Sequence, residues 1–137
     1  MMLSLASKND FEDIYKLWLA ANLSVRKSNL EKYDFERILE LNPTSCFIAT
    51  EKNNIIATVF GTFNGRRAWI YHLAVDPHYQ RNGYGSLLLK KVEAALKVRG
   101  AKKIILGVAL KNAETMPFYK KNGYDIMNDA ILMTKEI

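Results

Sequence analysis

The sequence contains few of the residues that build disulfide frameworks and metal sites. Its 137 residues include one cysteine and two histidines, and these three are not spaced as metal ligands. Cys46 has no partner for an internal disulfide, which indicates a reducing compartment, so we expect the protein in the cytoplasm. Because Cys46 lies in an apolar run (SCFIAT), we expect it to be a core residue rather than a nucleophile. We therefore expect no disulfide and no bound metal.

Long apolar runs and low-complexity segments are also absent. No run approaches the ~20 apolar residues that span a bilayer. The first residues (MMLSLASKNDFED) lack the basic and apolar regions of a signal peptide, so we expect no membrane association. Because 49% of the residues are hydrophobic and no linker interrupts the chain, residues 1–137 are predicted to form one domain, as a monomer or a homodimer.

Acidic residues are scarce in one half of the chain. The net charge is +6, but residues 81–121 contain ten Lys or Arg against two Glu, a net charge of +8, so the rest carries −2. A field of this kind attracts a polyanionic ligand, although many of these lysines are expected simply to be solvated. The lysines are dispersed and no nucleic-acid-binding motif occurs, so we expect no nucleic-acid partner.

Hydrophobic periodicity predicts an α+β fold. The predicted strands lie at about 2–6, 45–51, 55–63, 67–75, 104–108, 124–127 and 130–136, and the predicted helices at about 10–22, 34–41, 84–99 and 114–122. Residues 23–33 lack clear periodicity and are predicted to be a loop. We expect a mixed, mostly antiparallel sheet of six to seven strands, flanked by about four helices and containing one strand–helix–strand crossover.

The most informative segment is 68–88, AWIYHLAVDPHYQRNGYGSLL. A β-branched and aromatic run ends at Asp76-Pro77, and a glycine turn then opens into a leucine-rich helix. This geometry presents backbone N–H groups to an anion such as phosphate. A dinucleotide-binding motif would need a third glycine where Leu88 stands, and a P-loop would need a lysine after Gly85. The turn therefore predicts a phosphate binder of another kind.

The segment V-D-P-x-Y-Q-R-N-G-Y-G-S-x-L-L resembles the acyl-CoA signature Q/R-x-x-G-x-G/A of the GNAT (GCN5-related) N-acetyltransferase superfamily. Asn112 and the later run FYKKNGY at 118–124 resemble a second motif of that family, and the order of elements is similar over essentially the whole chain. The resemblance implies a GNAT-like fold and transfer of acetyl from acetyl-CoA to a primary amine of a small molecule or peptide.

The resemblance also implies residue roles. Coenzyme-binding residues around the turn would be Gln80, Arg81, Asn82, Gly83, Tyr84, Gly85 and Ser86, whose amides from 81 to 86 would cradle the pyrophosphate. The backbone of Leu73 and Val75 would pair with the pantetheine arm, and the Val75 N–H would polarise the thioester carbonyl. Asn112 would contact the pantetheine arm. Tyr119 would contact the coenzyme near its sulfur and protonate the leaving thiolate as general acid.

The acceptor side is less defined. Trp69 and Tyr71 are candidates to line an acceptor pocket, whereas Trp18 is expected in the core. Strand alternation places His72 on the face opposite Trp69 and Tyr71, unless a bulge reverses it, and we expect a buried structural histidine. We expect His78, in a turn, to be exposed.

No carboxylate occurs between 67 and 75 or between 102 and 110, where many family members place the general base. Several alternatives could account for removal of the amine proton. They are a water chain, a backbone carbonyl, a carboxylate from 23–40 (Glu31, Asp34 or Glu36), or an amine that enters partly deprotonated. The acceptor remains open among protein N-termini or lysines, polyamines, amino acids and antibiotic amines. A non-catalytic acyl-CoA-binding module is the alternative function.

Overall fold

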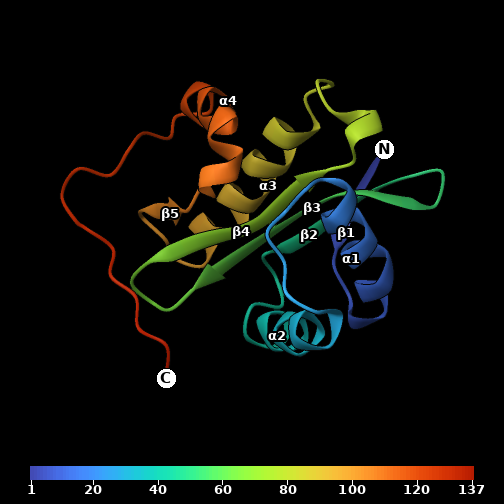
Figure 1. Cartoon of the computed structure of the whole chain (residues 1–137), viewed down its shortest axis with the longest axis horizontal. Helices are drawn as coiled ribbons and strands as arrows, with labels where there is room; N and C mark the ends of the chain where they lie inside the picture. Colours follow the sequence, from blue (N-terminus) through green and yellow to red (C-terminus); the bar gives the residue numbers. More distant parts are fainter. The chain divides into compact units, whose positions relative to one another are not determined.

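Five strands form one mixed sheet in the order β1-β2-β3-β4-β5 (Figure 1). They are β1 (Met2–Leu5), β2 (Cys46–Glu51), β3 (Asn54–Phe63), β4 (Ala68–Val75) and β5 (Ile104–Leu106). The first four strands pair antiparallel, and β4 and β5 are parallel, joined by helix α3 (Tyr84–Val98) as a crossover. The predicted fold class and crossover are confirmed, although the sheet has five strands instead of six to seven.

The structure, a computed structural model, describes every residue from 1 to 137 in two units, residues 1–107 and residues 108–137. The first unit holds the sheet, α1 (Phe11–Ala20), α2 (Ser28–Leu41) and α3, with short 3-10 turns η1 (Lys8–Asp10) and η2 (Pro77–Tyr79). The second holds η3 (Leu110–Thr115) and α4 (Met116–Lys121). None of the helices combines the length and apolar character needed to cross a lipid bilayer.

The two closing strands predicted at 124–127 and 130–136 are wrong. Residues 124–137 contain no strand, and no sixth strand joins the sheet. The prediction came from apolar side chains such as Ile126, Ile131 and Met133, which are exposed. Apolar content alone does not make a strand, because a strand also needs a neighbour to satisfy its backbone groups.

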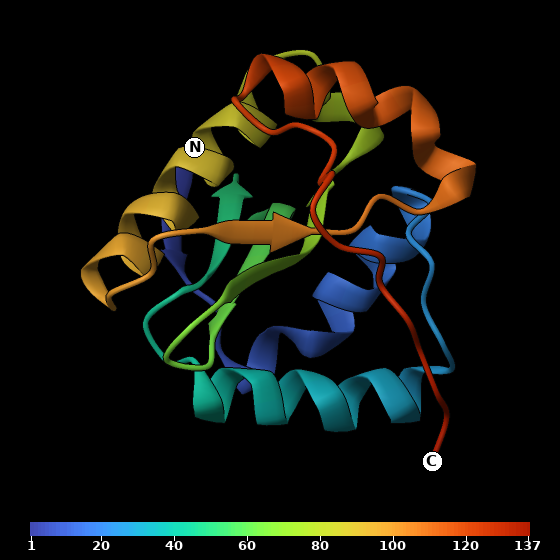
Figure 2. The same cartoon turned by 90° about the vertical axis from the view of Figure 1, so that its left-hand side faces the viewer.

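Helices α1 and α2 cover one face of the sheet in the first unit, and α3 covers the other (Figure 2). The core on the α1–α2 face is a cluster of aromatic and aliphatic side chains, which includes Phe11, Ile14, Trp18, Phe35, Leu39, Cys46 and Phe60. Cys46 is buried as predicted, and its burial raises the pKa of the thiol to about 12. On the opposite face, Gly61 lets Val92 and Leu96 of α3 pack directly on β3.

Helix α2 begins at Ser28, so the predicted loop at 23–33 is right only for residues 23–27, and the predicted helix start at 34 is wrong. Glu31, Phe35 and Leu39 are its buried residues, spaced four apart along one face. A carboxylate on this stripe interrupts the apolar pattern that the sequence prediction relied on. Glu31 tolerates burial because it accepts hydrogen bonds from the Arg26 backbone N–H and from Arg26 Nη2, both at 3.0 Å.

A β-bulge in β4 changes the predicted orientation of His72. The pairing shifts between Thr58–Ala74 and Phe60–Tyr71, which leaves one extra residue on β4, and His72 has a left-handed φ of +53°. Its ring stacks on Trp18 with centroids 4.1 Å apart, on the face that α1 covers. Tyr71 pairs with Phe60, a member of the core cluster on that same face. Tyr71 and His72 are therefore on the same face of the sheet, whereas strict alternation would place them on opposite faces. His72 is partly buried and packs against the core.

Arg99, the residue that follows α3, connects that helix to the loop after α2. Its Nη1 donates to Asn42 Oδ1 and to Ser45 Oγ, each at 2.8 Å, and its guanidinium lies 5.7 Å from the centroid of the Phe63 ring. Asn42 Oδ1 also accepts from the Phe63 N–H at 3.1 Å. One half-buried guanidinium therefore joins the end of α3, the end of α2 and the end of β3.

Candidate functional site

The turn between β4 and α3 is held by side chains that bond to its own backbone. Gln80 Nε2 donates to the Val75 carbonyl at 3.0 Å, and Asn82 Nδ2 donates to the Tyr79 carbonyl at 3.1 Å. The Asp76 carboxylate accepts from the His78 backbone N–H at 2.8 Å. His78 itself is exposed, as predicted. These bonds fix the path of the backbone without using the N–H groups at the start of α3.

The N-terminus of α3 has the chemistry of an anion site. Its N-cap, Gly83, has a left-handed φ of +81°, no side chain caps the helix, and no acidic residue occupies the first turn. The backbone N–H groups of Tyr84, Gly85 and Ser86 have no acceptor within the helix, since the first helical bond runs from the Leu87 N–H to the Gly83 carbonyl. Uncapped amides and the helix dipole together favour a bound phosphate.

One edge of β4 is open next to this helix start. The short β5 pairs with β4 only at Ala68–Ile104, Trp69–Ile105 and Ile70–Leu106. Beyond Ile70 no strand of the sheet pairs with this edge of β4, although β4 continues to Val75. The predicted residues Leu73 and Val75 belong to this unpaired stretch. Backbone groups there are available to an extended ligand that pairs as a strand does.

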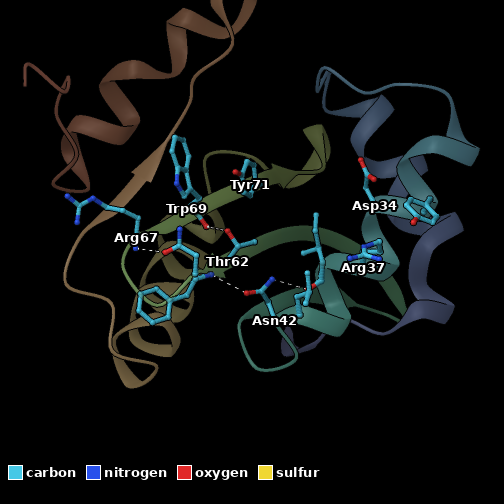
Figure 3. Close-up of a pocket in the computed structure, with 12 residues that line it drawn as sticks. Asp34, Arg37, Asn42, Thr62, Arg67, Trp69 and Tyr71 are labelled. Carbon is cyan, nitrogen blue, oxygen red and sulfur yellow. Dashed lines mark hydrogen bonds between the residues drawn. The ribbon is translucent and has the colours of Figure 1, made fainter. Parts of the chain in front are cut away.

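A pocket of about 790 Å³ lies between α2 and β4, and we call it the α2–β4 pocket (Figure 3). Its lining residues are Tyr33, Asp34, Arg37, Ile38, Leu41, Asn42, Thr62, Phe63, Asn64, Arg67, Trp69 and Tyr71. Trp69 and Tyr71 were predicted from the sequence, and the structure brings both to this pocket. The residues from α2 and from the β3–β4 turn were not predicted, because no sequence motif connects them to β4.

The carboxylates considered as a general base are engaged elsewhere. Glu31 is buried and bonded to Arg26, and Asp34 of the α2–β4 pocket also pairs with Arg26 Nη2. Glu36 does not line the pocket. Burial lowers the pKa of His72, an effect that Glu31 partly opposes and Arg26 reinforces. His72 Nδ1 is buried without a hydrogen-bond partner.

Asn112 and Tyr119 lie in the second unit, on η3 and at the C-terminal half of α4. Asn112 interrupts the helical conformation with φ −114° and ψ 24°, and its carbonyl accepts from Thr115 Oγ1 at 2.7 Å. The Tyr119 ring packs edge-on against Phe118 and Tyr124, with centroids 5.2 and 6.3 Å away. Burial raises the pKa of the Tyr119 hydroxyl, which therefore keeps its proton at neutral pH.

Comparison with known proteins agrees with this arrangement. A model of the Acetyltransferase (GNAT) family matches residues 11–124. The chain is 30% identical over 129 residues to an acetyltransferase of Sodalis glossinidius (strain morsitans), a match that covers 94% of this chain and 90% of that protein.

Two solved structures share the fold. The ribosomal-protein-S18-alanine N-acetyltransferase from Escherichia coli has a TM-score of 0.78 and 23% identity, covering 93% of this chain and 79% of that one. AAC(6')-Iy, in complex with the bisubstrate analogue CoA-S-monomethyl-acetylneamine, has a TM-score of 0.79 and 16% identity, covering 99% and 98%. With the family match extending over most of the sequence, these comparisons show that the chain belongs to the GNAT family of acetyltransferases.

Proposed function

We propose that this acetyltransferase transfers acetyl from acetyl-CoA directly to a primary amine, without an acyl-enzyme intermediate. The observation that carries the proposal is the uncapped N-terminus of α3, which the turn at residues 76–83 joins to the open edge of β4. The two features offer adjacent sites for a pyrophosphate and for an extended amide-containing arm. The shared fold with AAC(6')-Iy, which was solved with a coenzyme A analogue, supports the same assignment.

In this proposal the donor binds through backbone groups. Amides from Arg81 to Ser86 hold the pyrophosphate, and the left-handed φ values of Arg81 and Gly83 turn the chain so that successive N–H groups converge. The pantetheine arm pairs with the β4 edge at Leu73 and Val75. Asn112 contacts the same arm, as the family motif implies. Backbone recognition explains why the turn carries few charged side chains.

The proposed transfer is a single addition–elimination. The acceptor nitrogen attacks the thioester carbonyl carbon, a C–N bond forms and the C–S bond breaks. The Val75 N–H stabilises the carbonyl oxygen as negative charge develops on it. The Tyr119 hydroxyl gives its proton to the departing thiolate, a role that suits a phenol held protonated by burial.

The acceptor amine must reach the thioester unprotonated, and no free carboxylate takes its proton. Glu31 and Asp34 both pair with Arg26. His72 is not assigned this role. Its Nδ1 is buried without an acceptor, which favours the tautomer with the proton on Nε2, because a buried lone pair costs less than a buried N–H. We therefore propose that the neutral form of the amine binds from solution, so that turnover rises with pH towards the pKa of the acceptor.

Replacing Ser86 with Asp tests the donor site. A carboxylate in the first turn of α3 favours the helix, by about 0.3–1 kcal/mol, but repels a bound pyrophosphate. We expect the Ser86→Asp variant to remain as stable as wild type and to bind coenzyme A about tenfold or more weakly by calorimetry. The control, Lys97→Glu, lies in the last turn of α3 and alters the net charge twice as much. Equal weakening in both variants would refute binding at the α3 N-terminus.

Thiol release from acetyl-CoA tests the transfer step. The assay uses wild-type protein with primary amines of different charge and size, and we expect release that depends on the amine. Tight coenzyme A binding without amine-dependent release would show that the chain binds the donor but does not transfer it.

A further inference from the structure

The α2–β4 pocket is rich in unused hydrogen-bond donors and poor in unused acceptors. Asn42 Oδ1 accepts from Phe63 and Arg99, and its Nδ2 donates to the Ile38 carbonyl. Asn64 Oδ1 accepts from the backbone N–H groups of the two residues that follow Gly65, at 2.9 and 2.8 Å. Both amide oxygens in the lining are therefore already occupied, and neither is left to recognise a ligand donor.

The charges of the pocket have the same bias. Asp34 is the only carboxylate in the lining, and it pairs with Arg26. Arg37 and Arg67 form no ion pair. Glu40, one turn from Arg37 along α2, forms its ion pair with Lys8 at 2.7 Å; Lys8 chiefly, and Arg37 to a smaller extent, lower the pKa of the Glu40 carboxyl. The lining therefore has two arginines outside any ion pair, and its single carboxylate is already ion-paired.

The two cations lie on different sides of the Trp69 and Tyr71 rings (Figure 3). Arg37 comes from α2, and Arg67 from the β3–β4 turn just before β4, where its side chain extends outward from the rim. Between them the rings of Trp69 and Tyr71 are nearly parallel, with centroids 6.2 Å apart and an interplanar angle of 12°. Burial raises the pKa of Tyr71, so its hydroxyl remains a donor at neutral pH.

We propose that the acceptor is a small primary amine that also carries an anionic group, a carboxylate or a phosphate, which Arg37 binds directly while Arg67 at the rim adds to the positive field. The proposal rests on the proposed function and names the substrate class of that site. The volume of the pocket lies in the range of small-molecule sites, about 300–1,000 Å³. A guanidinium suits either anion because it can donate two parallel hydrogen bonds. Polyamines fit poorly, because their second positive charge would face Arg37 and Arg67 while the only carboxylate of the lining is ion-paired with Arg26.

Four para-substituted benzylamines test the charge preference with one reacting group and one flat ring. The substituents are carboxylate, phosphonate, carboxamide and aminomethyl. We expect the better of the two anions to exceed the carboxamide about tenfold in kcat/KM, as one charge-assisted hydrogen-bonded pair provides. The aminomethyl compound should be the poorest. The ratio of carboxylate to phosphonate tells which anion the site takes.

Variants locate the effect. Arg37→Gln should reduce the anion preference to about twofold or less, and Arg67→Gln should reduce it in part. The control is Arg66→Gln, an exposed arginine next to Arg67 that does not line the pocket, and it should leave the preference unchanged. A preference for the diamine, or an anion preference that survives in both Arg37→Gln and Arg67→Gln, would overturn the proposal.

A binding arm separates this proposal from the proposed function. The N-acetylated carboxylate and carboxamide products are titrated into wild-type and Arg37→Gln protein by calorimetry. Selective binding of the carboxylate product, lost in Arg37→Gln, supports the anionic subsite even where no amine is turned over. Equal binding of both products refutes the subsite, whether or not thiol is released from acetyl-CoA.

Discussion

The Thr58 hydroxyl donates a hydrogen bond to the carbonyl oxygen of His72 at 2.7 Å. The same hydroxyl accepts from Trp18 Nε1 at 3.1 Å. Thr58 is fully buried in β3, so it connects the indole of α1 to the bulged strand β4 through one oxygen atom. The bulge is thus fixed by a side-chain network as well as by the sheet.

Replacing Thr58 with Val should destabilise the fold by about 2–4 kcal/mol, because the Trp18 N–H and the His72 carbonyl both lose a buried partner while the volume is kept. Urea unfolding measures this. The control is Thr62→Val, whose hydroxyl makes only a long bond of 3.4 Å to the Trp69 carbonyl, and it should cost less than about 1 kcal/mol. Equal costs at the two positions would show that the Thr58 network is not special.

His72 should make stability depend on pH. Burial lowers the pKa of His72 in the folded state, Glu31 partly opposes this and Arg26 adds to it, so below about pH 6.5 the unfolded chain binds more protons at this residue. Stability should therefore be complete above that pH and fall as the pH drops towards 5. Asn tolerates the left-handed φ, so His72→Asn should remove this component of the slope. Identical slopes from pH 7.5 to 5.5 would contradict it.

Gly61 should not tolerate alanine. A Cβ there would lie 2.5 Å from Val92 Cγ2 and 3.0 Å from Leu96 Cδ1, so α3 would have to move away from β3. We expect Gly61→Ala to lower the free energy of unfolding by about 1–3 kcal/mol. At Gly107 no atom lies within 4 Å of the added Cβ, so Gly107→Ala should be neutral or slightly stabilising. A tolerated alanine at Gly61 would mean that α3 does not pack this closely.

Tyr119→Phe tests the proposed general acid. We expect kcat to fall by about 10²–10⁴ with coenzyme affinity unchanged, because only the proton donor is removed. In the wild type, activity should decline only above about pH 10, since burial raises the pKa of this phenol. Tyr124→Phe provides the matched control, as it removes a neighbouring phenol of the same unit and should retain turnover. Full activity in Tyr119→Phe would assign the proton to another donor.

Gly83→Ala separates backbone strain from coenzyme binding. Its φ is +81° and no atom lies within 4 Å of the added Cβ, so the cost is conformational, about 1–2 kcal/mol. Gly65, in the β3–β4 turn, has φ +93° and equally open surroundings. The two alanine variants should lose similar stability in denaturant unfolding, but only Gly83→Ala should bind coenzyme A more weakly. A matching loss of affinity in Gly65→Ala would point to global destabilisation.

Local signals in the sequence were sufficient for much of the fold. The strands predicted at 45–51 and 55–63 leave only Lys52-Asn53-Asn54 between them, which is short enough for a tight hairpin turn, and Lys52 and Asn53 both adopt the positive φ that such a turn needs. The glycine turn before α3 was likewise predictable, because its conformation depends on the glycines and on residues close to them in the chain. Such features depend on residues close together in the chain.

Features that depend on specific side-chain contacts, rather than on the local pattern of apolar residues, were missed. The start of α2 was hidden because Glu31 occupies a buried position that only the bond to Arg26 makes tolerable. The face of His72 follows from a bulge against β3, which period-two alternation cannot show. Arg37 and Arg67 meet at one pocket only because α2 and the β3–β4 turn lie beside each other in the fold. Trp69 and Tyr71 were candidates from the sequence, but the pocket that they line became visible only when the positions of α2 and the β3–β4 turn were known.

The Arg99 side chain connects α3, on one face of the sheet, to the end of α2 on the other face. Arg99 follows α3 directly and donates a hydrogen bond to Asn42, which lines the α2–β4 pocket. The helix proposed to bind the donor and the pocket proposed to bind the acceptor are therefore not independent modules. Redesign of the pocket for a different amine has to preserve Asn42, because its side-chain oxygen Oδ1 also holds Arg99 and with it the C-terminal end of α3. Substitutions at Arg37, Arg67 and Tyr33 can change the acceptor preference more freely, because these lining residues are not hydrogen-bond partners of Arg99.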